Sequence, residues 1–206
     1  MLNEMRMKGE DFAILAATDA KIARAVAAER CPHCKGPLHQ GNYHRKPRGG
    51  ALAEAGEAFT LRYSLCCGRR GCRRRVLPPS LRFLGRRVYL EMVLILASVQ
   101  AQVLGATKVA RAVTGVPEWT LRRWGSWWRT VLPSQDWWSE LRARFVPPPP
   151  DERELPRSLL KQIAEDTGAS DRDALGLCAR CLAPGTTRLR DAARFVRGVA
   201  AEFVAG

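Results

Sequence analysis

Apolar residues recur at the helical period near the start of the chain and again before its middle. Four apolar side chains in residues 1–30 fall near this spacing: Phe12, Leu15, Ile22 and Val26. They predict an amphipathic N-terminal helix that packs on a neighbouring element or on a second subunit. Residues 88–104 form a longer apolar run that includes Glu91 and two glutamines. That run indicates a core helix, because it is too short and too polar for a membrane span.

A period of two occurs in residues 59–67, where apolar and polar side chains alternate. The apolar positions are Phe59, Leu61, Tyr63, Leu65 and Cys67. The alternation predicts a β-strand that runs directly into a cysteine-bearing turn. Residues 46–56 are rich in Gly and Ala without a clear period, and we expect them to form the loop of the same hairpin.

Two short helical patterns flank a glycine in residues 107–129. The first helix is expected over residues 107–113, a tight turn at Gly115, and a second helix from Pro117, which suits a first helical position. A core-facing stripe on the second helix contains Leu121, Trp124 and Trp128. Two helices around a glycine, the second rich in arginine, are typical of a helix-turn-helix. A small residue usually precedes the turn glycine by four positions, whereas Ala110 precedes it by five, so a plain helical hairpin is the alternative.

The proline run Pro147–Pro150 predicts a stiff spacer and a domain boundary. Three helices are expected beyond it, near residues 155–165, 171–182 and 187–204. The predicted fold class is mainly α with a small β zinc ribbon. The predicted segments are an amphipathic helix (1–30), a zinc ribbon and basic connector (31–87), a helix-turn-helix domain (88–146), the proline linker (147–150) and a helical interaction module (151–206).

Cysteines supply the strongest chemical signal of the chain. Cys31 and Cys34 form one short-spaced pair, and about thirty residues later a second pair ends at Cys72. Two such pairs with glycines in the turns are typical of a structural Zn²⁺ site with four thiolate ligands. Cys67 is favoured over Cys66 as the third ligand, because it shares the apolar face of the strand and leaves four residues before Cys72.

Several other readings of the thiols and imidazoles stay open. Some cysteines are alternatively small buried apolar side chains without a metal. Three histidines are substitute ligands for one position: His33, His39 and His44. Cys178 and Cys181 repeat the short spacing within a helical pattern, where packed thiols are the better interpretation.

The net charge of +14 is concentrated on the cysteine-rich region. Residues 31–87 carry thirteen basic and two acidic side chains, whereas residues 1–30 and 150–206 are each neutral. A localised basic field is typical of a protein that binds a polyanion, above all nucleic acid. The predicted DNA contacts are Arg69, Arg70, Arg73, Arg74, Arg75, Arg82, Arg86, Arg87, Trp119, Arg122, Arg123, Ser126 and Arg129.

The pattern Cys31-Pro32-x-Cys34 with Cys67-x4-Cys72 and Arg73–Arg75 resembles the zinc ribbon that opens several bacterial insertion-sequence transposases. In that family a helix-turn-helix follows the ribbon, and both bind the terminal DNA of the element. The resemblance covers roughly residues 31–130. It implies that the four cysteines hold zinc and that the arginines and the 117–129 helix touch DNA.

The catalytic domain of those transposases has no counterpart in the residues after Pro150, and no catalytic motif is recognised elsewhere. We therefore expect a sequence-specific double-stranded DNA-binding accessory or regulatory factor of a mobile element, not an enzyme. The alternatives are an RNA- or ribosome-associated basic zinc protein and an enzyme completed by a partner. A transposase or recombinase is the expected protein partner, no membrane is expected, and a homo-oligomer is compatible with the sequence. Metal-like cysteine spacing without an apolar signal segment indicates a cytoplasmic, nucleoid-associated protein.

Overall fold

The computed structural model describes residues 9–46, 59–83, 91–104, 111, 115–145, 149–190 and 192–200. Within these ranges the chain is mainly helical and contains two small antiparallel sheets. It divides into two compact units. The cysteine unit combines Met7–Leu90 with Leu182–Gly206, and the helical unit is centred on Glu91–Cys181.

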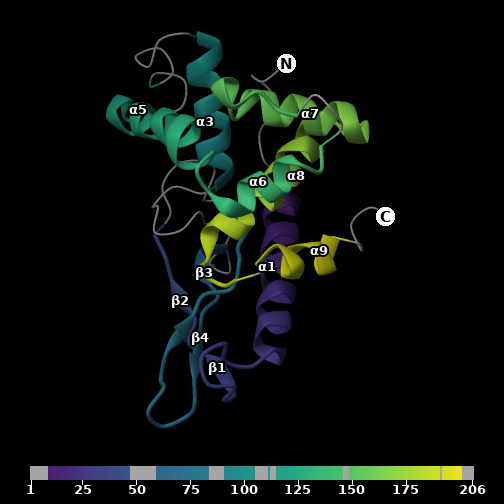
Figure 1. The fold of residues 1–206 in the computed structure, drawn as a ribbon. Helices are drawn as coiled ribbons and strands as arrows, with labels where there is room; N and C mark the ends of the chain where they lie inside the picture. Colours follow the sequence, from purple (N-terminus) through teal and green to yellow (C-terminus); the bar gives the residue numbers. More distant parts are fainter. Residues whose placement is uncertain are drawn as a thin grey trace. The chain divides into compact units, whose positions relative to one another are not determined.

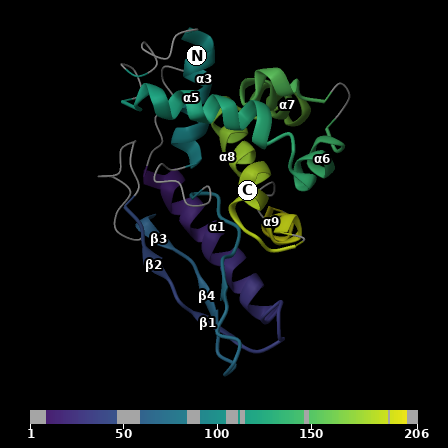
Figure 2. The same cartoon turned by 60° about the vertical axis from the view of Figure 1, so that its left-hand side comes forward.

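Helix α1 (Gly9–Ala28) confirms the predicted amphipathic helix. Its frequent alanines favour the helical state, and its apolar stripe is buried: Leu15, Ile22 and Val26 are all within the core. The stripe packs against strand β1 and against the last helix, α9 (Ala192–Ala200). In Figures 1 and 2, α1 runs alongside the strands of the cysteine unit.

The strands of the cysteine unit form a bent hairpin that is interrupted halfway along. Strands β1 (Leu38–Gln40), β4 (Leu65–Cys67) and β5 (Arg75–Val76) make a three-stranded sheet in the order β1-β4-β5. Strands β2 (Tyr43–His44) and β3 (Leu61–Arg62) form a separate pair. All neighbouring strands are antiparallel.

The predicted continuous strand over residues 59–67 is wrong in three respects. Residues 59 and 60 are helical, and the buried side chains include Arg62 and Ser64 from the predicted polar face. The strand also breaks at Tyr63 and Ser64, opposite a matching break at Gly41 and Asn42. The N–H of Gly41 donates to the carbonyl of Ser64 at 2.7 Å, and the Asn42 amide oxygen accepts from the N–H of Ser64 at 3.0 Å. These bonds satisfy the backbone where the ladder is interrupted.

The helical unit contains α3 (Glu91–Leu104), α5 (Glu118–Ser126), the π-helical turn η2 (Trp127–Val131) and α6 (Asp136–Arg142). A short 3₁₀ turn η3 (Glu152–Glu154) then precedes α7 (Arg157–Thr167) and α8 (Asp171–Leu182). The predicted tryptophan stripe is confirmed, because Leu121, Trp124 and Trp128 are buried. Pro117 stands one position before the first helical residue, and Gly115 has the left-handed φ of +67° that its predicted turn needs.

The proline run does not separate the two units. Within the helical unit, the indole N–H of Trp138 donates to Glu152 at 2.9 Å, and the Gln102 side chain donates to the carbonyl of Leu155 at 2.7 Å. The predicted module over residues 151–206 is instead divided near Leu182. The chain enters the cysteine unit at Leu182, so the 3₁₀ turn η4 (Ala183–Thr186) already belongs to that unit.

Helix α9 begins at Ala192, later than the predicted start at residue 187. The hydroxyl of Thr187 donates to the carbonyl of Leu77 and accepts from the N–H of Leu189. These bonds hold Thr187 in an extended conformation, with φ −132° and ψ 168°, so the helix cannot begin there. The late start leaves residues 187–190 as a non-helical segment of the cysteine unit.

Candidate metal centre

The first cysteine turn is closed by backbone hydrogen bonds between Cys31 and the residues that follow it. The N–H of Cys31 donates to the carbonyl of Gly36 at 2.9 Å, and the N–H of Lys35 donates to the carbonyl of Cys31 at 2.8 Å. A Cβ at position 36 would lie 3.1 Å from the Cys67 sulfur and 3.3 Å from the Cys34 sulfur. A side chain there would crowd the two sulfurs, which would have to shift by a few tenths of an ångström.

The second turn lies between Cys67 and Cys72. The N–H of Cys72 donates to the carbonyl of Arg69 at 3.1 Å, and Gly71 adopts a left-handed φ of +84°. The N–H of Gly68 donates to the carbonyl of Pro37 at 2.9 Å and so ties the second turn to the end of the first. Strand β4 delivers Cys67 to the cluster through its pairing with β1.

The two turns bring four thiols together at one point. The sulfurs of Cys31, Cys34, Cys67 and Cys72 all lie within 4.8 Å of one another. The Cys31 and Cys72 sulfurs are 3.8 Å apart, and those of Cys34 and Cys67 are 3.4 Å apart. A tetrahedral site with metal–sulfur bonds of about 2.3 Å places its sulfurs about 3.8 Å apart. The donor set therefore fits a tetrahedral metal ion with four thiolate ligands.

Among the thiols of the group, the pKa of Cys34 is lowered, whereas the pKa values of Cys67 and Cys72 are raised. The backbone N–H of Gly36 lowers the pKa of Cys34 to about 7, so a large share of this thiol is already a thiolate. The backbone N–H of Arg69 lowers the pKa of Cys67, but burial and the hydrogen bond with Cys34 outweigh it and raise that pKa to about 12. A metal ion must displace the protons that remain on these thiols, so we expect it to bind more weakly as the pH falls.

Cys67, and not Cys66, belongs to the four-sulfur group, in agreement with the predicted choice. The Cys66 thiol lies outside the four-sulfur group and donates to the carbonyl of Arg73 at 3.6 Å. Among the described residues, the group includes no histidine: His33 contacts the Arg74 guanidinium and His44 contacts the hydroxyl of Thr60. The later pair of Cys178 and Cys181 also lies outside the group, and Cys178 is buried, as predicted for a packed thiol.

Exposed arginines surround the second cysteine turn. Arg69, Arg70, Arg73, Arg74 and Arg75 are all exposed. Two of them contact the first turn: Arg69 donates to the carbonyl of Cys34 at 3.2 Å, and Arg74 reaches His33 at 3.1 Å. These five predicted DNA contacts are therefore exposed on or beside the second turn, and two of them also link it to the first turn.

The predicted role of Arg82 as a DNA contact is wrong. Its side chain is 1% exposed and is held by Asp19, whose carboxylate lies 2.9 Å from the guanidinium. The same guanidinium donates to the carbonyls of Phe59 and Leu61 at 2.7 and 2.8 Å. A buried, fully partnered cation cannot reach a phosphate. Arg86 and Arg87 lie outside the described residues.

The predicted DNA contacts of the second helix share one exposed face of α5 and its extension. Trp119, Arg122, Arg123, Ser126 and Arg129 are all exposed, and their spacing matches a single helical stripe. Trp119 is 63% exposed and lies against the Arg123 guanidinium, 5.0 Å from the ring centre. Arg122 pairs with Glu118 at 2.6 Å. The first helix of the predicted motif lies outside the described residues apart from Arg111.

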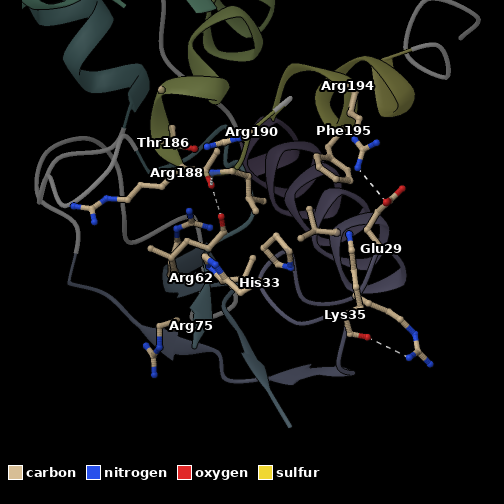
Figure 3. Close-up of a pocket in the computed structure, with 18 of the residues that line it drawn as sticks. Glu29, His33, Lys35, Arg62, Arg75, Thr186, Arg188, Arg190, Arg194 and Phe195 are labelled. Carbon is tan, nitrogen blue, oxygen red and sulfur yellow. Dashed lines mark hydrogen bonds and ion pairs between the residues drawn. The ribbon is translucent and has the colours of Figure 1, made fainter. Parts of the chain in front are cut away.

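A large basic groove in the cysteine unit was not predicted. It has a volume of about 1180 Å³ and is lined partly by Arg188, Arg190 and Arg194 from the last part of the chain (Figure 3). The net charge of zero over residues 150–206 gave no sign of a basic surface there. The acidic residues that balance these arginines lie mostly before Leu182, in the other unit. One local feature of the sequence indicates this basic surface: Arg188 and Arg190 alternate with other residues after the predicted turn at Pro184 and Gly185.

Comparison with known proteins gives no relative from which a role can be carried over. No family model, no curated protein and no solved structure matches this chain. In the part of the chain that the structure describes, no helix is long and apolar enough to cross a membrane.

Proposed function

We propose that this protein binds double-stranded DNA and serves as an accessory or regulatory factor of a mobile genetic element. In this proposal the cysteine unit is a zinc ribbon that grips the phosphate backbone, and α5 reads base edges as the second helix of a helix-turn-helix. The protein itself performs no chemistry. A transposase or recombinase is the partner that would act on the bound DNA.

The distribution of charge between the two units carries the proposal. The cysteine unit contains twenty-one basic and eight acidic side chains, a net charge of +13. The helical unit contains thirteen basic and twelve acidic side chains, a net charge of +1. Such a field on one small unit attracts a polyanion strongly, and its exposed arginines around the metal centre match the spaced phosphates of a nucleic acid.

Zinc is the metal that four cysteine thiolates fit best. Thiolates favour soft and borderline cations, and zinc adopts tetrahedral geometry without redox chemistry. Cys31, Cys34, Cys67 and Cys72 would fill the coordination shell, which leaves no position for water or substrate. The ion would therefore be structural, and its contribution would be to lock the two turns and present their arginines.

The sequence resemblance to insertion-sequence transposases supports the mobile-element context. It rests on the cysteine spacing, the arginine run Arg73–Arg75 and the order of the ribbon before the helical region. A recombinase gene beside the gene for this protein would strengthen this assignment, and co-purification with that recombinase on the ends of the element would test it directly.

Replacement of Arg70 and Arg73 by alanine is expected to weaken binding to every duplex equally. Both side chains are exposed on the turn, where they would contact phosphates without reading bases. Loss of two phosphate contacts should flatten the salt dependence of log K by about 1.8, at roughly 0.9 per contact. A salt titration by fluorescence anisotropy on two unrelated duplexes measures this. An unchanged slope would remove the turn from the interface.

Arg122→Ala and Arg123→Ala are expected to behave differently from the turn variants. The cognate duplex is first selected from a randomised pool with the wild-type protein. Each helix variant should lose about 1–3 kcal/mol on that duplex and little on a scrambled one, because a guanidinium held on a packed helix can contact guanine in a fixed register. Equal losses on both duplexes would show that α5 does not read bases, and a matched RNA hairpin tests the RNA alternative.

A further inference from the structure

The basic groove of the cysteine unit is built from three separate parts of the chain. One part is the end of α1 with the first cysteine turn, which contributes Arg30 and Lys35. The second is the strand region, with Tyr43 and Arg75, and the third is the segment that follows η4. Figure 3 shows the labelled side chains of all three parts around the same hollow.

The groove carries a strong excess of positive charge. Its described lining includes eight arginine and lysine side chains: Arg30, Lys35, Arg45, Arg62, Arg75, Arg188, Arg190 and Arg194. Glu29 is the acidic side chain among the described lining residues, and it pairs with Arg194 at 3.0 Å. Arg62 is buried and donates hydrogen bonds to the carbonyls of Tyr63 and Pro78, so its role in the groove wall is structural. Arg188 and Arg190 line the groove and are exposed.

Apolar surface lies between these cations. Pro32 is exposed, Leu77 and Leu189 are partly exposed, and Tyr43 is 37% exposed. The Arg75 guanidinium lies over the Tyr43 ring, 5.6 Å from its centre. A ligand that fits this lining has flat apolar groups as well as regularly placed negative charges.

We propose that this groove binds an unpaired DNA strand, an inference that rests on the proposed nucleic-acid function of the cysteine unit. An unpaired strand offers phosphates to the arginines and base faces to the tyrosine and apolar side chains, as in other sites for single strands. A duplex keeps its base faces stacked inside and would leave the apolar lining unused. The volume of about 1180 Å³ slightly exceeds that of pockets that enclose drug-sized molecules, which suits a few nucleotides.

The inference gives the end of the chain a function that its sequence did not suggest. Residues 182–200 were expected to belong to a neutral interaction module, yet they supply three of the cations of the groove. Thr187 anchors this segment to Leu77, and the resulting late start of α9 leaves Arg188 and Arg190 on non-helical backbone. The groove therefore depends on the tertiary contact and not on a helical pattern.

The test compares three double variants on a fluorescent oligothymidylate of about 15 nucleotides and on duplex DNA. Arg188→Ala/Arg190→Ala removes the two exposed groove cations. Arg70→Ala/Arg73→Ala removes two cations of the cysteine turn that do not line the groove. Arg153→Ala/Arg157→Ala is the matched control, with the same loss of charge on exposed positions of the helical unit.

The groove variant is expected to bind oligothymidylate about tenfold more weakly than wild type, with a salt slope flatter by about 1.4 at roughly 0.7 per contact. Its duplex affinity should stay within about twofold, and the control should match wild type on both probes. The inference is overturned if wild type does not bind oligothymidylate, if the groove variant binds it normally, or if that variant loses both probes equally. Failure of the proposed duplex function is a separate result, in which wild type ignores duplex DNA but binds the single strand through the groove.

Discussion

Cys34→Ser and Cys72→Ser are each expected to abolish stoichiometric zinc binding and to unfold both cysteine turns. The four sulfurs come from two turns 33 to 41 residues apart in the sequence, which the metal ion would hold together. Apparent binding energies of structural zinc sites are about 10–16 kcal/mol near neutral pH, so its loss outweighs the few backbone hydrogen bonds of each turn. Metal analysis should give about one zinc per wild-type chain and a small fraction of that for either variant.

Hydrogen exchange distinguishes local unfolding from general damage. The amides of Cys31, Lys35, Gly68 and Cys72 should lose their protection in the variants, because each donates a backbone bond that closes or joins the turns. Helix α7 belongs to the other unit and should keep its protection.

Cys66→Ser is the matched control for the ligand variants. Its thiol lies next to a ligand in sequence but outside the cluster, so the variant should retain full zinc content. Equal zinc loss from Cys66→Ser, or unchanged protection of the turns in strong chelator, would contradict the assignment of the metal centre.

The four-sulfur group was predictable because its signals are local. Turn glycines and short cysteine spacing identify the two turns, and the alternation of the strand selects Cys67 rather than Cys66. The buried faces of α1 and α5 were predictable for the same reason, because a single helical period of apolar residues determines which side of each helix faces the core. Local periodicity fixes such choices because burial on one face is the dominant energetic term.

The division into units was not predictable in this way. The proline run marks a stiff segment, but stiffness does not prevent packing across it, as the contacts of Trp138 and Gln102 show. The return of residues 182–200 to the cysteine unit depends on contacts such as that of Thr186 with Ser80. A pair separated by 106 positions leaves no periodic signal in either segment.

Arg82 illustrates a related failure. In the sequence it belongs to a run of arginines and is indistinguishable from its surface neighbours. Its partner Asp19 lies 63 positions earlier, on a helix for which only an apolar packing stripe was predicted. Only the tertiary fold shows that the two charges are buried together, and this moves Arg82 from the interface to the core.

Asp19→Ala is expected to destabilise the cysteine unit by about 3–5 kcal/mol, the usual cost when one partner of a buried ion pair is removed. The Asp19 carboxylate accepts from the guanidinium of Arg82, from the hydroxyl of Ser80 at 2.5 Å and from the N–H of Leu81 at 2.7 Å. Its removal leaves the Arg82 charge buried beside three aromatic rings without a counterion: those of Phe59, Tyr63 and Phe83. Chemical denaturation of the zinc-loaded protein, followed by circular dichroism, measures the change.

Two further variants separate the buried charge from other effects. Glu29→Ala breaks the exposed pair with Arg194 and should cost less than about 1 kcal/mol, because solvent screens that pair. The double variant Asp19→Ala/Arg82→Met removes both buried charges and should recover part of the lost stability, since an apolar pair avoids the desolvation cost of an isolated guanidinium. The ion pair would not anchor α1 to the strand region if Asp19→Ala lowered the free energy of unfolding by less than about 1 kcal/mol. The same conclusion would follow if Arg82→Met, added to Asp19→Ala, lowered the free energy of unfolding further instead of raising it.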